Sequence, residues 1–224
     1  EFIWTIIPVI VLAALIIYGL FTWSDIMYVD EDEDPLVIEL YAYQFDWRAR
    51  YSGKDNTLGK ANVRLIEGIN QLGVDTSDPN AQDDKVVNEL HLPLGRKVLF
   101  KMRSQDVLHS AYMPHFRAQM NCVPGMITQF AFTPSMTTDD MRMNDEVIEK
   151  EEYINQIRTE KNIELLAKGE EVLEMYEFDY LLLCNKICGS NHFNMQMKII
   201  VDTEEKYNTW LAEQATIAET IKNK

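Results

Sequence analysis

The chain opens with an uninterrupted apolar stretch. Residues 2–23 carry no charged side chain. A helix of this length, at about 1.5 Å per residue, spans a hydrocarbon core of about 30 Å. Trp4 lies near one end, and Tyr18 and Trp23 lie near the other, where aromatic side chains suit the two membrane interfaces. The pattern predicts a transmembrane helix over residues 1–24, and the alternative is a helix buried in a soluble core.

An acidic segment follows the apolar stretch. Acidic residues run from Asp30 to Asp34 and precede Pro35, which interrupts regular structure, so residues 25–35 are predicted to form a linker. No Lys or Arg follows the helix before Arg48. Because positive side chains favour the cytoplasmic side, we expect the helix in a bacterial inner membrane and the rest of the chain in the periplasm.

After the linker, short apolar runs alternate with turn-forming residues. The predicted strands are 36–45, 89–92, 97–102, 126–133, 176–183 and 197–201. The polar segment at residues 53–84 interrupts this series and is expected to be a surface insert. Many short strands with turns between them predict an all-β protein, an antiparallel sandwich or barrel.

Two segments break the strand pattern. Between residues 139 and 174, apolar residues recur at helical spacing among Glu and Lys, which predicts one or two amphipathic helices ending near Gly169. Residues 204–224 are predicted to form a terminal helix. We therefore expect a β domain over residues 36–203, with inserts near 53–84 and 139–174.

Net charge and cysteine content exclude some classes of function for this protein. The 224 residues carry a formal net charge of -15 at pH 7. Nucleic-acid binding needs clustered Lys and Arg, so this charge excludes a nucleic-acid partner. It favours a cationic partner, or it serves only solubility. Three cysteines do not form a disulfide framework, and Cys122 is expected to be a small buried apolar residue.

The densest candidate chemistry lies near the end of the β domain. Cys184, Cys188, His192 and Met195 offer two thiolates, an imidazole and a thioether within a short stretch. Sulfur and imidazole ligands suit copper, and they do not suit magnesium or calcium. Two thiolates can be shared by two metal ions, and a second copper would then need its own imidazole. His109, soon after an apolar strand-like run, offers one.

Two other interpretations of this cluster stay open. A structural zinc site of the Cys2His2 kind suits the cysteines, although zinc has no use for the Met195 thioether. A disulfide between Cys184 and Cys188 would form in an oxidising compartment, but it would leave His192 and Met195 unexplained.

At these residues the sequence resembles a known family. The spacing C-x3-C-x3-H-x2-M, with D-V-L-H-S at residues 106–110, is similar to subunit II of haem-copper cytochrome c oxidases. Further similar stretches, in the same order, are E-F-I-W-T-I-I-P at 1–8, Y-Q-F-D-W at 43–47 and V-P-G at 123–125. The resemblance implies an all-β, cupredoxin-like Greek-key barrel with an N-terminal transmembrane helix and a helical insert. The family has an earlier transmembrane helix, so we expect an N-terminus that is processed or incomplete.

The resemblance also implies a dinuclear copper centre, CuA. Its implied ligands are the bridging thiolates of Cys184 and Cys188, one imidazole for each copper from His109 and His192, the weak ligand Met195, and the main-chain carbonyl of Lys186. The family uses a glutamate side chain at the position of Lys186 to help bind an interfacial magnesium ion. A lysine has no acceptor atom, so that magnesium is not expected here.

The implied function is electron transfer within a respiratory terminal oxidase. A cytochrome c-type donor, free or held in a supercomplex, reduces CuA, and the electron passes to haem in subunit I, where oxygen is reduced to water. The implied partners are the donor, subunit I, other oxidase subunits and membrane lipid. Glu1 matches a residue at the mouth of a proton channel. Phe45 takes the place of the exposed tryptophan that receives electrons, and Trp47 is expected on the same strand face.

At some positions the sequence departs from the family pattern, which limits the family properties that can be assigned to this chain. Ala111 and Asn121 replace an aromatic and an acidic residue that are usual near the docking surface, so we expect a donor other than the common soluble cytochrome c. A quinol oxidase subunit II lacks the copper ligands kept here, and nitrous oxide reductase carries a large propeller domain. The alternative function is a membrane-anchored copper- or zinc-binding cupredoxin without an oxidase role.

Overall fold

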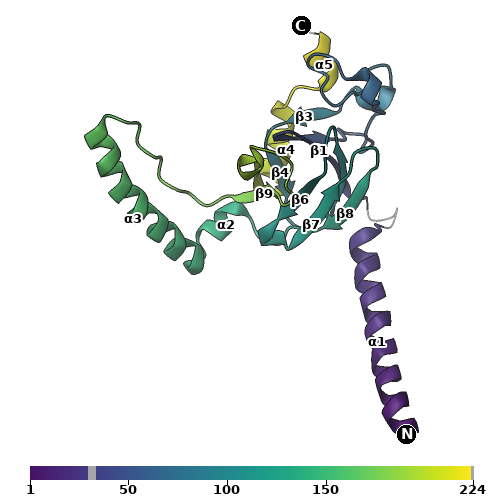
Figure 1. The fold of residues 1–224 in the computed structure, drawn as a ribbon. Coiled ribbons are helices and arrows are strands. Elements are labelled where there is room, and N and C mark those ends of the chain that lie inside the picture. Colours follow the sequence, from purple (N-terminus) through teal and green to yellow (C-terminus); the bar gives the residue numbers. More distant parts are fainter. Residues whose placement is uncertain (30–33, 223–224) are drawn as a thin grey trace.

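A long apolar helix stands beside a β domain (Figure 1). The computed structural model describes residues 1–29 and 34–222, so residues 30–33 of the predicted acidic linker lie outside it. α1 (Phe2–Met27) buries none of its residues against the rest of the described chain. Within those residues it is the helix long and apolar enough to cross a membrane. The alternative of a buried soluble helix therefore finds no support in the described chain.

Residues 34–222 contain ten strands in two five-stranded sheets. The strands are β1 (Leu36–Tyr43), β2 (Asp46–Tyr51), β3 (Lys85–Val87), β4 (Leu90–Pro93), β5 (Val98–Ser104), β6 (His109–Met113), β7 (Ala118–Cys122), β8 (Thr128–Phe132), β9 (Tyr180–Cys184) and β10 (Gln196–Asp202). One sheet has the order β3-β2-β1-β5-β8, and the other has the order β4-β10-β9-β6-β7. The chain crosses repeatedly between the sheets, and the predicted cupredoxin-like fold is confirmed.

Two strand pairs are parallel. β1 runs beside β5, with Leu36 opposite Val98, and β4 runs beside β10, with Leu92 opposite Val201. The other pairs of named strands in the described chain are antiparallel. The expectation of a purely antiparallel sandwich or barrel is thus corrected. The chain leaves the first sheet after β3 and returns as β5 in the direction of β1.

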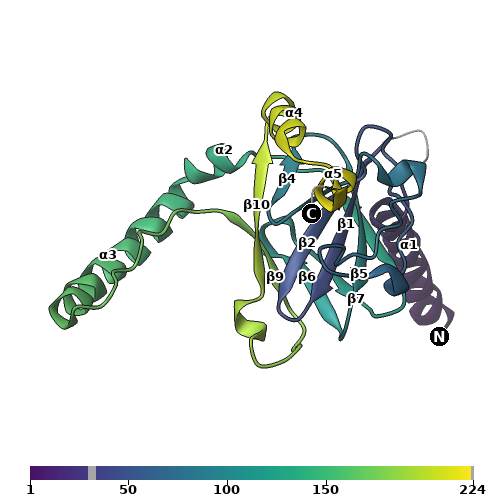
Figure 2. The ribbon, with the colours of Figure 1, turned by 90° about the horizontal axis from the view of Figure 1, so that it is seen from above.

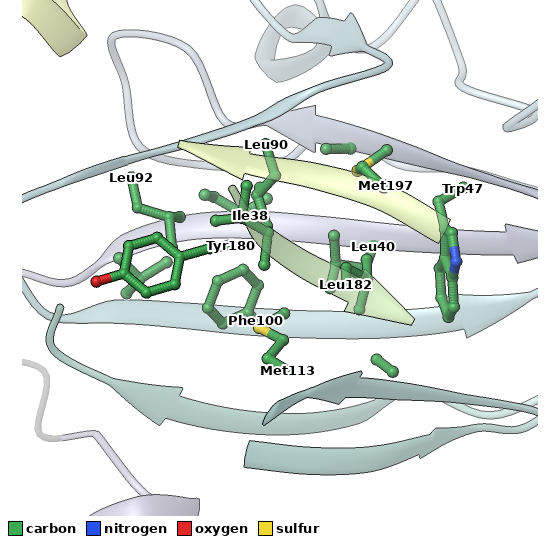
Figure 3. Packing of buried hydrophobic residues seen from close by; sticks show 14 of the residues in the cluster. Ile38, Leu40, Trp47, Leu90, Leu92, Phe100, Met113, Tyr180, Leu182 and Met197 are labelled. Atoms are coloured by element: carbon green, nitrogen blue, oxygen red, sulfur yellow. The ribbon is translucent and has the colours of Figure 1, made fainter. Parts of the chain in front are cut away.

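The hydrophobic core lies between the two sheets (Figure 3). Ile38 and Leu40 of β1, Phe100 of β5 and Leu182 of β9 are all fully buried. Burial alternates along β5 and β9, as expected when one face of a strand points inward. Burying one large apolar side chain stabilises the fold by about 1.5–3 kcal/mol. The packed core therefore gives the loops at the strand ends a firm base.

Helices and turns lie outside the sheets. The helical insert between β8 and β9 consists of α2 (Thr138–Arg142) and α3 (Asp145–Lys168). Two helices follow β10, namely α4 (Glu204–Glu213) and α5 (Ile217–Lys222). The short 3-10 turns are η2 (Val63–Leu65), η3 (Pro79–Ala81), η4 (Pro114–Phe116) and η5 (His192–Asn194). The single predicted terminal helix is corrected to two. Lys85 Nζ donates to the carbonyls of Leu211 and Gln214, where α4 ends.

A buried ion cluster attaches the polar insert to the first sheet. Arg50 of β2 contacts Glu39 Oε2 at 2.6 Å and Asp84 Oδ2 at 3.0 Å. Its Nη1 also donates to the Gly59 carbonyl at 3.0 Å, and Arg103 shares Glu39. Arginine is normally an exposed residue, so a buried arginine interrupts the apolar pattern by which a strand is recognised. For this reason the sequence does not predict β2. β3, β6 and β7 also escaped prediction, because they are short and carry polar residues.

The buried carboxyl of Asp84 should make stability depend on pH. Burial raises its pKa from 3.8 to about 6, although Arg50 and the Gly59 amide favour the ionised form. The folded state therefore holds the proton more tightly than the unfolded chain does. The contribution of this group to stability falls as the pH rises from about 4 to about 6, by at most about 3 kcal/mol.

We expect Asp84→Asn to remove this part of the pH dependence. The free energy of unfolding of the full chain in detergent, measured by denaturant titration at several pH values, checks it. The exposed Glu213→Gln is the control, and it should keep the slope of the unmodified chain. An unchanged slope in Asp84→Asn would contradict the assignment.

Candidate metal centre

Strand pairing brings two distant parts of the chain to one end of the second sheet. Cys184 ends β9 and His109 begins β6, and these strands are neighbours, with Ala111 opposite Cys184. His109 Nδ1 lies 3.7 Å from Cys184 Sγ, although the two residues are 75 positions apart. The sheet register thus sets the first imidazole against the first thiol.

The loop between β9 and β10 supplies the remaining candidate ligands. Cys184 Sγ lies 3.8 Å from Cys188 Sγ. Cys188 Sγ in turn lies 3.6 Å from His192 Nδ1 and 3.8 Å from the Met195 sulfur. The Lys186 carbonyl oxygen lies 3.2 Å from Cys184 Sγ. The structure therefore brings together all six donor groups that the sequence singles out.

The donor set fits a soft metal ion. The atoms of His109, Cys184 and Cys188 lie within 4.8 Å of one another, and all three residues are buried. A metal–thiolate bond is about 2.3 Å long, so one ion can bond to both sulfurs across 3.8 Å. The same separation is far longer than the roughly 2.05 Å of a disulfide, and both cysteines are free. The disulfide interpretation is therefore not supported.

The two thiols differ in their tendency to ionise. Burial opposes ionisation of Cys184, but contact with His109 and with backbone groups outweighs it and lowers the pKa of this thiol. Burial and the negative charge of Cys184 raise the pKa of Cys188. Cys184 is therefore the thiol that ionises more readily, and its negative charge opposes ionisation of Cys188. Metal binding must release a proton, as is usual for thiolate sites.

Several side chains behind the ligands hold them in place. His109 Nε2 lies 2.9 Å from Asp106 Oδ1, which leaves Nδ1 facing the thiols. Asp106 also accepts hydrogen bonds of 2.7 Å from the backbone amides of Gln44 and Val107. A carboxylate behind a ligating histidine commonly fixes its tautomer and orientation. The D-x-x-H spacing in the sequence signals this arrangement, and sequence reasoning did not use it.

The turn between β1 and β2 closes the site from the opposite sheet. Gln44 Nε2 donates to the carbonyl of Cys188. Gly189 has φ of 142°, and a Cβ there would come within 2.8 Å of the Phe45 ring. Trp47 packs edge-on against His109, with 6.2 Å between the ring centroids. Nothing in the sequence pattern alone marked Gln44 or Gly189 as part of the site.

The candidate residues for electron and proton transfer lie in different surroundings. Phe45 is part of the turn before β2 and is partly exposed. Trp47 is fully buried, so the expectation that it shares a strand face with Phe45 is wrong. The reason is that β1 ends at Tyr43 and β2 begins at Asp46, which puts a turn at Phe45. Glu1 lies at the end of α1 remote from the β domain (Figure 1).

Comparison with known proteins places the chain in a family. The profile described as "Cytochrome C oxidase subunit II, periplasmic domain" matches residues 36–140. The "Alternative cytochrome c oxidase subunit 2" of Bradyrhizobium diazoefficiens is 35% identical over 208 residues, covering 92% of this chain and 60% of that protein. The chain belongs to the cytochrome c oxidase subunit II family.

Other similarities are more distant. The "Cytochrome c oxidase subunit 2" of Alkalihalophilus pseudofirmus is 23% identical and covers 100% of this chain and 48% of that protein. The solved periplasmic domain of subunit II of cytochrome oxidase from Bradyrhizobium japonicum is 17% identical, with a TM-score of 0.44, covering 79% of this chain and 91% of that one. This chain therefore spans about half to three fifths of the length of the two curated relatives.

The contact between Gln44 and the cysteine loop should tune metal binding. We expect Gln44→Ala to weaken copper binding about 10- to 100-fold, the range usual when a group supporting a ligand is lost. Gln105→Ala in the nearby β5–β6 loop is the control and should bind as the unmodified chain does. Competition with a copper chelator measures the affinity. Equal affinities for the two variants would contradict the role of Gln44.

Proposed function

We propose that this chain is the subunit through which electrons enter a respiratory terminal oxidase. The observation that carries the proposal is the pair of cysteine sulfurs 3.8 Å apart, each facing its own imidazole. The four donor atoms of one tetrahedral ion would all lie within about 4 Å of one another. His192 falls outside the group formed by the ligand atoms of His109, Cys184 and Cys188, which lie within 4.8 Å of one another, so two ions that share the sulfurs fit this set better than one. The thioether of Met195 favours copper over zinc. Family membership supports the same reading.

Each residue of the centre has a stated role in this proposal. The ligands of the dinuclear copper are the shared thiolates of Cys184 and Cys188, the imidazoles of His109 and His192, the thioether of Met195 and the carbonyl of Lys186. When bound, the two coppers supply one-electron chemistry. The protein keeps the ligands still and partly shielded from water, because four of these side chains are buried and β6 and β9 anchor two of them.

Electrons pass over the exposed side of the centre in this proposal. Ile187 and Phe193 are 87% and 85% exposed and lie beside the ligands Cys188 and His192 in sequence. Such apolar side chains suit close contact with a partner. Phe45, against Gly189, remains the candidate for electron uptake from a cytochrome c-type donor. Haem in subunit I then receives the electron, and oxygen is reduced to water there.

Lys186 sets this chain apart from the family pattern. Its main-chain carbonyl faces Cys184, so the side chain is not needed for the proposed copper contact. An ammonium group has no lone pair for a cation and repels one. We therefore infer that this position does not hold the family's interfacial magnesium, and that the charge of Lys186 contacts acidic groups of subunit I instead.

The proposed location follows from α1 and the charge pattern. α1 anchors the chain in the inner membrane, surrounded by lipid, since its apolar side chains are exposed along its length. The absence of Lys and Arg between α1 and Arg48 favours the periplasmic side for the β domain. Subunit I and other oxidase subunits are the proposed neighbours in that membrane. Glu1, at the opposite end of α1, remains the candidate for the mouth of a proton channel.

A pair of cysteine substitutions tests the electron-transfer role. Cys184→Ser removes a shared thiolate, and we expect haem reduction in the assembled oxidase to slow by more than the roughly 100-fold seen when only a supporting group is lost. Stopped-flow absorbance after mixing with a reduced cytochrome c-type donor measures the rate.

Cys122→Ser is the matched control for this experiment. Cys122 is buried in β7 opposite His109 but lies outside the donor set, and burial raises the pKa of its thiol to about 12. The control should keep fast haem reduction while losing about 1–3 kcal/mol of stability for the buried hydroxyl. Fast haem reduction in Cys184→Ser would contradict electron entry through this centre.

A further inference from the structure

The helical insert forms an arm that stands clear of both sheets. The arm comprises α3 and the return segment 170–179, and it projects sideways from the β domain in both overall views (Figures 1 and 2). Val147, near its root, is the buried residue of α3 within the described chain. Most helices owe their stability to packing of an apolar face. This helix lacks such packing along most of its length.

The arm is nevertheless held straight by an internal set of hydrogen bonds. Asn155 and Asn162 are seven residues apart, so they lie on one face of α3 two turns apart. The Asn155 amide donates to the Tyr176 carbonyl at 2.9 Å and accepts from the Tyr176 amide at 2.6 Å. Asn162 bonds to Leu173 in the same two ways, at 2.8 and 2.7 Å. Side chains of the helix thus form the backbone hydrogen bonds of the return segment that a neighbouring strand would otherwise form.

The root of the arm is braced to the β domain. Arg142 donates to the Phe178 carbonyl at 2.9 Å and pairs with Asp179 at 2.9 Å and with Glu177 at 3.1 Å. Lys198 of β10 pairs with Asp179 at 2.9 Å. These contacts fix the direction in which the arm leaves the sheet. A braced projection differs from a flexible linker, which would need no such contacts.

The arm exposes large apolar side chains to water. Ile163 and Leu166 of α3 are each 66% exposed, and Ile157, Val172 and Met175 are also exposed. Of these, Ile163 and Leu166 lie three residues apart on one face of α3, and exposed apolar neighbours of this kind are typical of an interaction surface. Interfaces that stay assembled are also more apolar than transient ones. The arm therefore suits a partner that remains bound.

The charge of the arm indicates which partner fits. Residues 145–179 contain twelve acidic and four basic side chains, and the return segment has no Lys or Arg. A hollow of about 590 Å³ beside α3 is lined by Ile148, Glu151, Glu152 and Glu177, and by Arg142, whose charge already pairs with Glu177 and Asp179. A lysine or arginine from outside can cover Ile148 with its methylene groups while its charge meets the glutamates. A second copy of the arm and an anionic lipid surface would both be repelled.

We propose that the arm is a docking surface for a protein with a basic, partly apolar surface that stays bound to the oxidase outside the membrane. A basic side chain of that protein occupies the hollow at Glu151 and Glu152, and its apolar groups cover Ile163 and Leu166, which lie on the same side of the helix as Glu152. This role goes beyond electron transfer at the metal centre and does not depend on copper.

Amide hydrogen exchange tests the proposal on the assembled oxidase. The oxidase is isolated with its neighbours at low ionic strength and compared with the full chain purified alone in detergent. We expect α3 amides to exchange at least about tenfold more slowly in the assembly, which is the mass-action effect of a partner present above ten times its Kd. High salt should reduce this protection, because the Debye length shrinks from about 10 Å at 0.1 M to about 3 Å at 1 M.

Charge reversal identifies the part of the arm that is responsible. Glu151→Lys with Glu152→Lys should abolish the protection. The control is Glu205→Lys with Glu213→Lys, which makes the same charge change in another exposed acidic hollow, on α4. The control should keep the protection. Both variants should keep the copper absorption of the unmodified chain, so failure here is distinct from failure of the electron-transfer role.

Carboxyl-to-amine cross-linking then identifies what lies against the arm. Peptides that join arm glutamates to lysines of a different polypeptide are expected. Equal exchange rates in the assembly and the isolated chain would overturn the proposal. Cross-links between two copies of this chain would overturn it, and so would protection of the isolated chain by anionic vesicles alone.

Discussion

The pairing of β6 with β9 is the contact on which the candidate metal centre depends. It places Ala111 opposite Cys184, and this register sets His109 against the first cysteine. A slip of one residue would turn His109 to the other face of the sheet. Leu182 of β9 is fully buried in the core, so the register is tied to packing of the whole domain. The candidate ligands are in place because the barrel is folded.

The opposite sheet contributes support rather than ligands. The turn between β1 and β2 reaches the cysteine loop through Gln44, and it reaches the histidine through the carboxylate of Asp106. The Phe45 ring fills the space that Gly189 leaves open. Ligands held from two sides need to move little when the charge of a metal changes. That property suits repeated one-electron transfer better than it suits a structural zinc site.

Most of the elements and candidate ligands that the sequence predicts follow from patterns among residues close together in the chain. The charge-free stretch, the apolar runs and the spacing of Cys184, Cys188, His192 and Met195 are local patterns, and each corresponds to an element or cluster in the structure. The sequence does not predict the roles of residues that depend on contacts with distant parts of the chain. In the sequence Arg50 resembles a surface residue, but in the fold it is buried and pairs with Glu39 and Asp84. Phe45 and Trp47 do not share one strand, because β1 ends at Tyr43 and β2 begins at Asp46, and a turn of that kind leaves little trace in composition.

The central claim is that one unpaired electron is shared by two coppers across the two cysteine sulfurs. Electron paramagnetic resonance of the copper-loaded, partly reduced full chain tests it most directly. The account predicts a hyperfine pattern from two equivalent copper nuclei, in a protein that holds two coppers per chain. A pattern from a single copper nucleus, or a protein that retains one zinc and takes up no copper, would contradict it.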